Sequence, residues 1–306
     1  MWNTYYCYHR RMADNFNEPS FYWIWIDGRK GIQRYIWGGF FRIYMKHRVI
    51  MPPINMEPNP DNLYFKSIIC VIRPYDLGGY GDLTFRYDDP RFDVKWAYLP
   101  AMRRIRRLSA GSWMDSCLGT DWTNDDLQVF DPRIEWYKDF KFLGKKTLLM
   151  PAESNPKGYL DEVWAKDPVK GAPICDFKNP PYWNSVGQWY QPTEVYITEC
   201  IPPDEHPYSR RIHYVDAENF VPYFGELYDN RGEYWKWQEM DVIRRKECYK
   251  GRMTYKPDLM WQRDVQNLHA TCAQINPHYK GDFNKDNDPD FTLDFFQTST
   301  LLKMAR

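Results

Sequence analysis

The densest group of potential metal ligands lies in the segment D115-S-C-L-G-T-D-W-T-N-D-D126. It carries Asp115, Asp121, Asn124, Asp125 and Asp126. Oxygen ligands at this density can bind calcium, but the spacing matches no calcium-loop template. Asp and Asn side chains commonly cap turns instead. We therefore expect a solvated loop here rather than a metal site.

A second acidic stretch, DFNKDNDPDFTL (282–293), places Asp or Asn at every second position from Asp282 to Asp290. This spacing resembles an EF-hand loop. However, Asn287 stands where such a loop needs glycine, and Leu293 stands where it needs a bidentate glutamate. Calcium binding at 282–293 therefore stays an open question, and we predict no metal site.

Signatures of catalysis are missing from the sequence. The six His form neither HxH nor HExxH, and no GxSxG, Walker loop or GxGxxG occurs. The seven Cys form no CxxC, so they indicate either buried thiols or one to three long-range disulfides. We predict a protein that is not an enzyme, with no catalytic residues and no cofactor. A carboxylate pair for glycoside hydrolysis stays open, because its separation is spatial.

The basic run RRIRR (103–107) could bind an anion. In a strand, Arg104 and Arg106 would face one way and Arg103, Ile105 and Arg107 the other. Arginine binds phosphate bidentately, so Arg104 and Arg106 are our candidates for contact with an anionic group or lipid headgroup. The balance of 41 Lys and Arg against 41 Asp and Glu favours the alternative, in which these arginines pair with Asp121, Asp125 and Asp126.

Aromatic residues make up 18% of the chain, including 14 Trp and 24 Tyr. Such rings favour strands, and Trp and Tyr suit surfaces that are polar at one edge and apolar elsewhere. Most of them are expected to pack in a core, while some line a groove for an apolar ligand. Our candidates for ligand binding are Trp96, Tyr98, Tyr196, Trp235 and Trp237.

Extended segments come in two series. The first comprises 21–27, 40–50, 64–72, 82–87, 94–100 and 103–108; the second is a four-strand meander over 194–200, 209–215, 219–229 and 233–243. Pro222 predicts an edge position or a bulge. Between the series, 109–193 is a long irregular insertion with one strand at 139–151, and loops of this length usually have a function or cover a face. Helices are expected at 160–167, at 257–274 and at the C-terminus, so that 257–306 forms a helical segment.

These elements predict a mainly β protein in which a curved antiparallel sheet forms a barrel or half-barrel, with long loops and a few covering helices. The balanced charge argues against a nucleic-acid partner. No run of about 18 apolar residues is present to form a membrane-spanning helix. The first residues, MWNTYYCYHRR, lack the apolar core of a signal peptide. Either an exported protein is seen here in processed or truncated form, or the chain is cytosolic.

Four stretches resemble a known family in the same order: WAYLPAMRRIRRLSAGSWMDSCLGTDWTNDDL (96–127), FKFLGKKTLLMP (140–151), RRIHYVDAENFVPYFGELYDNRGEYWK (210–236) and DFTLDFFQTSTLLKMAR (290–306). The chain is similar to the domain-of-unknown-function family numbered thirteen twenty-nine, of the LolA/LolB-like lipoprotein-sorting superfamily. The likeness covers roughly residues 80 to 306. It departs at Phe220, where the family has Trp, and in lacking the family's longer N-terminal portion.

The resemblance implies one LolA/LolB-like domain over 1–306, without some N-terminal strands of the family. It implies a curved sheet with a helical lid around a hydrophobic cavity. It also implies a site in the periplasm or at the periplasmic face of the outer membrane of a Gram-negative bacterium. No catalytic residues are established for the family, so none can be assigned by resemblance.

We therefore expect a binding or shuttle protein for a lipid, a lipoprotein acyl chain or another hydrophobic molecule, with peripheral membrane contact or an envelope transport complex as partner. Burial of an acyl chain is favourable by about 0.8 kcal/mol per CH₂, so an apolar cavity could hold one without chemistry. Two alternatives stay open. One is a structural subunit of an envelope complex, with loops 109–127 and 172–193 as its interface. The other is a glycan-binding or carbohydrate-active protein.

Overall fold

The structure is a computed structural model, and it describes residues 1–8, 13–74, 76–151, 178–185, 189–249, 252–275, 286–288 and 290–304. Within these residues the protein is mainly β. Its strands are β1 (Asn15–Asp27), β2 (Gly31–Tyr44), β3 (Leu63–Arg73), β4 (Gly81–Tyr87), β5 (Val94–Leu99), β6 (Arg104–Arg107), β7 (Asp139–Pro151), β8 (Tyr190–Ile201), β9 (Tyr208–Asp216), β10 (Pro222–Asp229), β11 (Tyr234–Tyr249), β12 (Arg252–Asp264) and β13 (His269–Ile275).

All of these strands belong to one antiparallel sheet of 13 strands, in the order β6-β5-β4-β3-β2-β1-β13-β12-β11-β10-β9-β8-β7. The chain runs outward from β1 to the edge strand β6. It then resumes at the opposite edge with β7 and returns to pair β13 with β1. The two edge strands are therefore neighbours in sequence, and the connection between them must cross the sheet.

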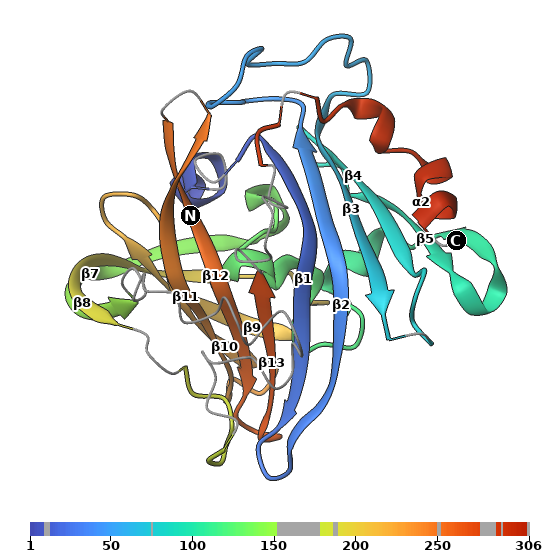
Figure 1. Cartoon of the computed structure of the whole chain (residues 1–306). Helices are drawn as coiled ribbons and strands as arrows, with labels where there is room; N and C mark the ends of the chain where they lie inside the picture. Colours follow the sequence, from blue (N-terminus) through green and yellow to red (C-terminus); the bar gives the residue numbers. More distant parts are fainter. Residues whose placement is uncertain are drawn as a thin grey trace.

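The sheet is strongly bent, and the connection from β6 to β7 runs through its concave side, where it is drawn in green (Figure 1). This connection carries the short 3-10 helices η3 (Ala110–Met114), η4 (Asn124–Val129) and η5 (Ile134–Trp136). We call residues 109–137 the inner segment. Other short helices are η1 (Thr4–Tyr8), η2 (Pro100–Met102) and η6 (Leu293–Phe295).

The C-terminal helix α2 (Thr298–Met304) lies on the other face of the sheet (Figure 1). Leu83 of β4 packs with Leu301 of α2, while its neighbours Asp82 and Thr84 lie with Asn124 of the inner segment. Successive side chains of a strand point to opposite faces. Helix α2 and the inner segment therefore cover opposite faces, which we call the outer and the concave face.

Most of the strand predictions are confirmed, including the meander over β8 to β11 and the short strand β6. A register shift between Pro222 and Phe224 confirms the predicted bulge, although β10 is an internal strand rather than an edge. Of the cysteines, Cys70, Cys117, Cys200 and Cys272 are buried free thiols. Among the described helices, none is long and apolar enough to cross a membrane.

The helix predicted over 257–274 is wrong. This stretch forms the end of β12, a turn at 265–268 and β13, with Asp264 opposite His269. Both strands lie in the middle of the sheet and have buried residues on both faces, such as Leu259, Trp261 and Gln262. A strand buried on both faces shows no polar–apolar alternation, so its pattern was mistaken for a helix. The C-terminal helical segment begins only at Leu293, and the helix predicted at 160–167 lies outside the described residues.

Candidate functional site

The inner segment is held in its local shape by its own polar residues. Thr123 and Asp126 form a capping box at the start of η4, in which the Asp126 carboxylate accepts a hydrogen bond from the Thr123 backbone N–H at 2.8 Å. An isolated β-bridge joins Ser116 to Thr123. These contacts close the loop on itself and turn the two consecutive carboxylates, Asp125 and Asp126, toward the sheet.

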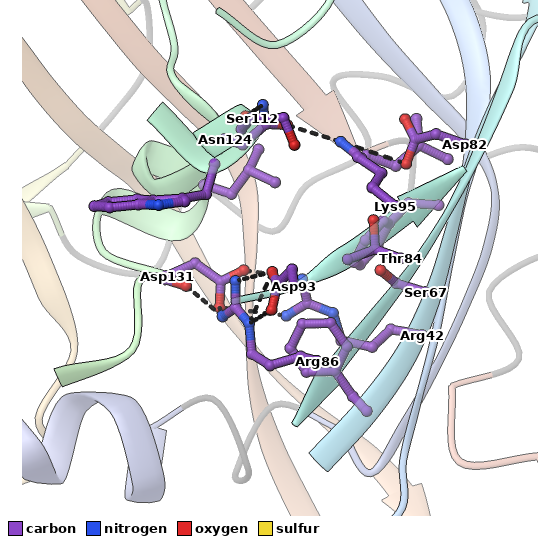
Figure 2. A pocket seen from close by; sticks show the side chains of 15 residues that line it. Arg42, Ser67, Asp82, Thr84, Arg86, Asp93, Lys95, Ser112, Asn124 and Asp131 are labelled. Atoms are coloured by element: carbon purple, nitrogen blue, oxygen red, sulfur yellow. Dashed lines mark hydrogen bonds and ion pairs between the residues drawn. The ribbon is translucent and has the colours of Figure 1, made fainter. Parts of the chain in front are cut away.

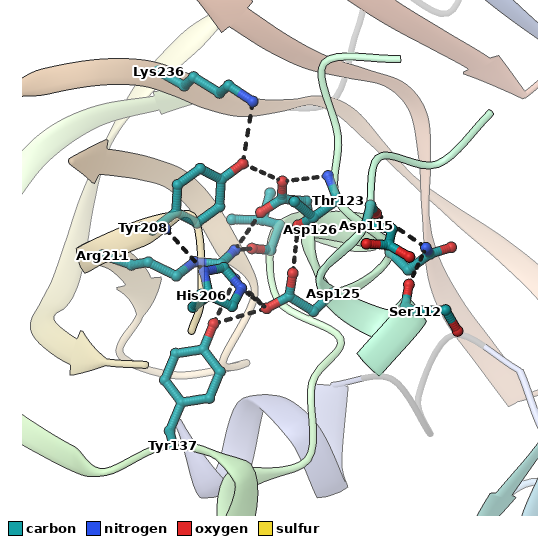
Figure 3. Close-up of polar contacts among 12 residues, drawn as sticks. Ser112, Asp115, Thr123, Asp125, Asp126, Tyr137, His206, Tyr208, Arg211 and Lys236 are labelled. Carbon is teal, nitrogen blue, oxygen red and sulfur yellow. Dashed lines mark hydrogen bonds and ion pairs between the residues drawn. The ribbon is translucent and has the colours of Figure 1, made fainter. Parts of the chain in front are cut away.

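Both carboxylates meet Arg211 of β9 in a fully buried cluster (Figure 3). The Arg211 Nη1 atom lies 3.1 Å from Asp125 Oδ2, and Nη2 lies 2.9 Å from Asp126 Oδ1. Tyr137 donates its hydroxyl to Asp125 at 2.8 Å, and Tyr208 donates to Asp126 at 2.7 Å. We call these five residues together with His206 the arginine cluster.

The electrostatics of the arginine cluster are those of a permanent ion pair. Burial alone would raise the pKa of Asp125, but the charges and hydrogen bonds of His206 and Arg211 outweigh it and hold that pKa below its usual value. His206 accepts the Tyr208 backbone N–H at Nδ1 (3.0 Å), so Nε2 faces Asp125 at 3.1 Å as the donor. A His–Asp pair of this kind resembles part of a catalytic triad. Both side chains are 0% exposed.

A second chain of ion pairs fastens the end of the inner segment to the other half of the sheet (Figure 2). Asp131 accepts from Arg42 of β2 at 2.9 Å and lies 3.4 Å from Arg86 of β4. Arg86 in turn lies 2.9 Å from Asp93. Burying unpaired charge is costly, so each of these groups depends on the others.

Two further contacts complete the attachment. Lys95 of β5 donates to the side chain of Asn124 at 3.0 Å and lies 3.6 Å from Asp82. On the far side, Asp121 accepts from Thr271 of β13 at 2.6 Å and lies 2.8 Å from the imidazole of His269. The inner segment is thus tied by charged groups to both halves of the bent sheet.

Among the described residues, two small voids of about 40 and 50 Å³ lie beneath the inner segment. The larger is lined mainly by apolar side chains of the adjacent strands β3, β2, β1, β13 and β12, together with Leu127 and Gln128 of the inner segment. Gln128 and Val129 both have positive φ, at 54° and 71°, which is rare for residues with a Cβ. The middle of the concave face is therefore filled by the chain itself and is not the open apolar cavity that the sequence predicts.

An open cavity of about 420 Å³ lies instead between the N-terminal residues and strands β7, β8 and β9. We call it the β7–β9 cavity. Its volume falls in the range of about 300–1,000 Å³ that is usual for ligand pockets. Phe142 and Tyr196 meet edge to face with ring centroids 5.9 Å apart, and Phe142 is 66% exposed. The residues that line the β7–β9 cavity are Met1, Trp2, Asn3, Thr4, Phe140, Lys141, Phe142, Tyr196, Thr198, Val215 and Phe220.

The structure does not gather the predicted aromatic residues into one site. Of the five, Tyr196 lines the β7–β9 cavity. Trp96 and Tyr98 lie on the outer face and pack into the cluster around α2. Trp237 is also on the outer face, beside Phe224 at 4.8 Å, and Trp235 donates to Asp264 at 2.9 Å while packing against Tyr208. The role of each residue in ligand binding stays a prediction.

The predicted solvated acidic loop is wrong for its most important members. Asp125 and Asp126 are 1% and 0% exposed and pair with Arg211, and Asp121 pairs with His269. For the same reason the alternative in which these acids pair with the 103–107 arginines is wrong. Arg104 and Arg106 are exposed on β6 instead.

The described part of the chain contains no group of three or more His, Cys, Asp or Glu placed to hold a metal ion. In the 282–293 stretch, the side chain of Asn287 accepts the Asp14 backbone N–H at 2.8 Å, and Asp286 accepts that of Asn17 at 3.0 Å. Both residues thus attach this stretch to β1. Asp282 and Asn284 lie outside the described residues.

The sequence gives no sign of several residues that organise the site. Arg211 and His206 are 86 and 81 positions from Asp125, so no local motif marks them. Tyr137 is 12 positions from Asp125 and belongs to no recognised motif. The exposed Phe142 could have been noticed, since its strand alternates less regularly than the others and carries a glycine at the bulge beside Ile197.

Comparison with known proteins places this fold in a family. A sequence model of the family described as Protein of unknown function (DUF1329) matches residues 1–301. A search among curated proteins found no match.

Several solved structures share the fold. A DUF1329 family protein from Desulfovibrio piger ATCC 29098 has a TM-score of 0.61 at 17% identity, covering 96% of this chain and 93% of its own. A domain from Vibrio parahaemolyticus titled as an outer membrane lipoprotein-sorting protein has a TM-score of 0.60 at 15% identity, covering 96% and 95%. A LolA superfamily protein from Nitrosomonas europaea has a TM-score of 0.53 at 11% identity, covering 96% and 99%. At these identities the likeness shows the fold alone.

Proposed function

We propose, from the premise that this chain belongs to the DUF1329 family of proteins of unknown function, that it binds and carries a hydrophobic molecule in the β7–β9 cavity. The carrying step needs no chemistry on the ligand, so the protein is not proposed to be an enzyme. Its fold is that of the LolA superfamily and of a domain titled for lipoprotein sorting, which supports a carrier placed in the periplasm or at the periplasmic face of the outer membrane.

The observation that carries this proposal is an open cavity with exposed aromatic walls. Trp2 and Phe142 are 60% and 66% exposed, although burying such side chains is favourable by about 1.5–3 kcal/mol each. A lipid chain lying against them would remove this surface from water and would gain about 0.8 kcal/mol per CH₂. Contiguous exposed apolar surface of this kind usually marks a binding site.

The middle of the concave face is less suited to this task. Its voids of about 40 and 50 Å³ are too small for a lipid chain while the inner segment is attached. The segment is held there by three arginines: Arg211 pairs with Asp125 and Asp126, and Arg86 and Arg42 pair with Asp131. Binding at the β7–β9 cavity requires none of these ion pairs to break.

The alternative of a structural subunit receives less support, because residues 109–127 belong to the inner segment and their large aromatic side chains, Trp113 and Trp122, are buried against the protein itself. Part of the other proposed interface, 172–193, lies outside the described residues. For a glycan-binding protein, no observation on the described residues favours stacked sugar rings over an apolar ligand.

The experiment is a titration with an apolar naphthylamine fluorophore, together with native mass spectrometry of protein purified without detergent. We expect saturable probe binding and a co-purifying lipid-sized ligand. Tyr196→Ser should weaken probe binding about five- to tenfold, since it removes roughly 1 kcal/mol or more of aromatic contact. Tyr234→Ser is the matched control, because Tyr234 is 41% exposed and does not line the cavity.

Two results would overturn the proposal. One is a protein that binds no apolar probe and carries no ligand. The other is probe binding that Tyr234→Ser weakens as much as Tyr196→Ser, since binding would then occur elsewhere. Thr198→Trp is an independent test, because the bulky side chain fills the cavity. It should abolish probe binding although all apolar lining residues remain.

A further inference from the structure

One edge of the sheet carries a concentrated positive charge. Strand β6 (Arg104–Arg107) is an edge strand, and Arg103, Arg104, Arg106 and Arg107 in and beside it are all exposed. We call these four residues the arginine edge. They are separated only by Ile105, which is partly buried.

Among the residues that the structure describes, no carboxylate pairs with the arginine edge. Within the described residues, none of its four guanidinium groups takes part in a hydrogen bond, an ion pair or a ring contact. Other exposed arginines behave differently. Arg91 lies 2.7 Å from Asp89, and Arg231 lies 2.9 Å from Glu233. In a chain with a net charge of +0, four unpaired arginines at one place form a local field of one sign.

The geometry lets one flat surface meet all four side chains. Arg104 and Arg106 lie opposite Leu99 and Ala97, while Arg107 lies opposite Trp96, so the arginines of β6 flank its free edge from both faces. Arg103 directly precedes the strand. A surface that approaches β6 edge-on therefore faces both rows. Arginine side chains are long enough to turn their charged ends toward such a surface while their stems lie along the sheet.

Exposed apolar side chains accompany the charge. Met102, in the short helix directly before β6, is 49% exposed. Leu302 of α2 is 45% exposed, and α2 packs against β4 and β5 beside the edge. Cations flanked by protruding apolar groups are the composition of segments that lie at a membrane interface, where the charges meet headgroups and the apolar groups enter the acyl boundary.

We propose that the arginine edge docks this protein on a membrane surface that contains anionic phospholipid. Arginine binds phosphate bidentately, which suits phospholipid headgroups. A partner strand is a poorer occupant, because β6 offers only four residues for pairing. This inference does not depend on the β7–β9 cavity, which lies at the opposite edge of the sheet.

The test is co-sedimentation of the purified full chain with phosphatidylcholine vesicles prepared with and without phosphatidylglycerol. Each arginine near an anionic membrane contributes about 1 kcal/mol, or about fivefold in affinity. The double variants Arg104→Gln/Arg106→Gln and Arg103→Gln/Arg107→Gln should therefore each bind the anionic vesicles about 25-fold more weakly. Met102→Ser should weaken binding further, and added salt should weaken the wild type.

The matched control is Arg91→Gln/Arg231→Gln, which removes the same total charge from two exposed arginines that already have carboxylate partners. It should bind the anionic vesicles like the wild type. The proposal is overturned if the wild type does not distinguish the two kinds of vesicle, or if the control loses as much affinity as the edge variants. It is also overturned if inorganic phosphate at matched ionic strength displaces the protein completely, since the edge would then be a site for free phosphate. Probe binding in the β7–β9 cavity should be unchanged in all these variants.

Discussion

Asp125 and Arg211 are 86 positions apart in sequence, yet their side chains meet at 3.1 Å with neither exposed to solvent. Asp125 belongs to the inner segment and Arg211 to β9, so this pair joins the connection between the two sheet edges to the wall it crosses. The middle of the bent sheet is filled because of such pairs. The β7–β9 cavity, at the β7 edge, lies outside this attachment.

The first prediction concerns the cost of removing Arg211. Arg211→Met leaves Asp125 and Asp126 buried without their cation, so we expect the free energy of unfolding to fall by about 3–5 kcal/mol. Urea unfolding followed by fluorescence measures it. The neighbouring Arg210 is 41% exposed and lies 3.6 Å from Glu199, so Arg210→Met should cost only about 0–1 kcal/mol. Equal costs at the two positions would show that the arginine cluster does not hold the fold.

Much of the fold could be predicted from the sequence, because strands with one solvated face show alternation and are bounded by turn residues. Segment 219–229 is an example, because β10 alternates partly exposed and buried residues from Phe224 to Tyr228. The central strands β12 and β13 could not be predicted, since both of their faces are buried and the alternation is lost. Their strand character follows only from pairing with β11 and β1.

The candidate site was less predictable than the fold. Without knowledge of their partner, Asp125 and Asp126 are predicted to belong to a solvated acidic loop. Their partner, Arg211, lies in a strand whose sequence carries no distinguishing motif. Long-range pairing of charges leaves no local pattern in a sequence. Tyr196 was found because an aromatic residue on a strand is conspicuous, but Trp96 and Tyr98 are equally conspicuous and pack beneath α2.

The second prediction concerns the strained turn at Gln128. Its φ of 54° costs a residue with a Cβ about 1–2 kcal/mol, whereas glycine adopts it freely. We expect Gln128→Gly to change the free energy of unfolding by less than about 1 kcal/mol, because relief of strain offsets the lost side-chain contacts. Gln128→Val, with a branched Cβ, should lower it by about 1–2 kcal/mol. If both variants unfold alike, the positive φ is not a constraint on the inner segment.

The third prediction concerns the close approach of β2 and β3 at Gly38. A Cβ at this position would lie 2.1 Å from the backbone oxygen of Cys70, and the backbone of a central strand cannot move away freely. Gly38→Ala should therefore reduce stability by at least about 2–3 kcal/mol and lower the soluble yield. Gly111→Ala is the control, because the nearest atom to its Cβ would be Met114 Cε at 3.8 Å, and it should change stability by less than about 0.5 kcal/mol. Thermal unfolding measures the stability of both variants. A loss of stability in Gly111→Ala as large as that in Gly38→Ala would contradict the prediction.

The fourth prediction concerns the pH dependence of the contact between His269 and Asp121. The hydrogen bond and charge of Asp121 raise the pKa of His269 above its ordinary value of 6.5, against the opposing effect of burial. A group whose pKa is raised on folding stabilises the folded state fully below its unfolded pKa, and this contribution is lost as pH rises through the raised value. The attachment of the inner segment to β13 should therefore weaken as the pH rises from the unfolded-state pKa of His269 through its raised folded-state pKa. NMR titration of the imidazole should give a His269 pKa above 6.5 in the wild type and a lower pKa in Asp121→Asn. Asp27→Asn is the control: it removes a more remote charge, so it should lower the His269 pKa far less. An unchanged His269 pKa in Asp121→Asn would mean that this pair carries no pH-dependent part of the attachment.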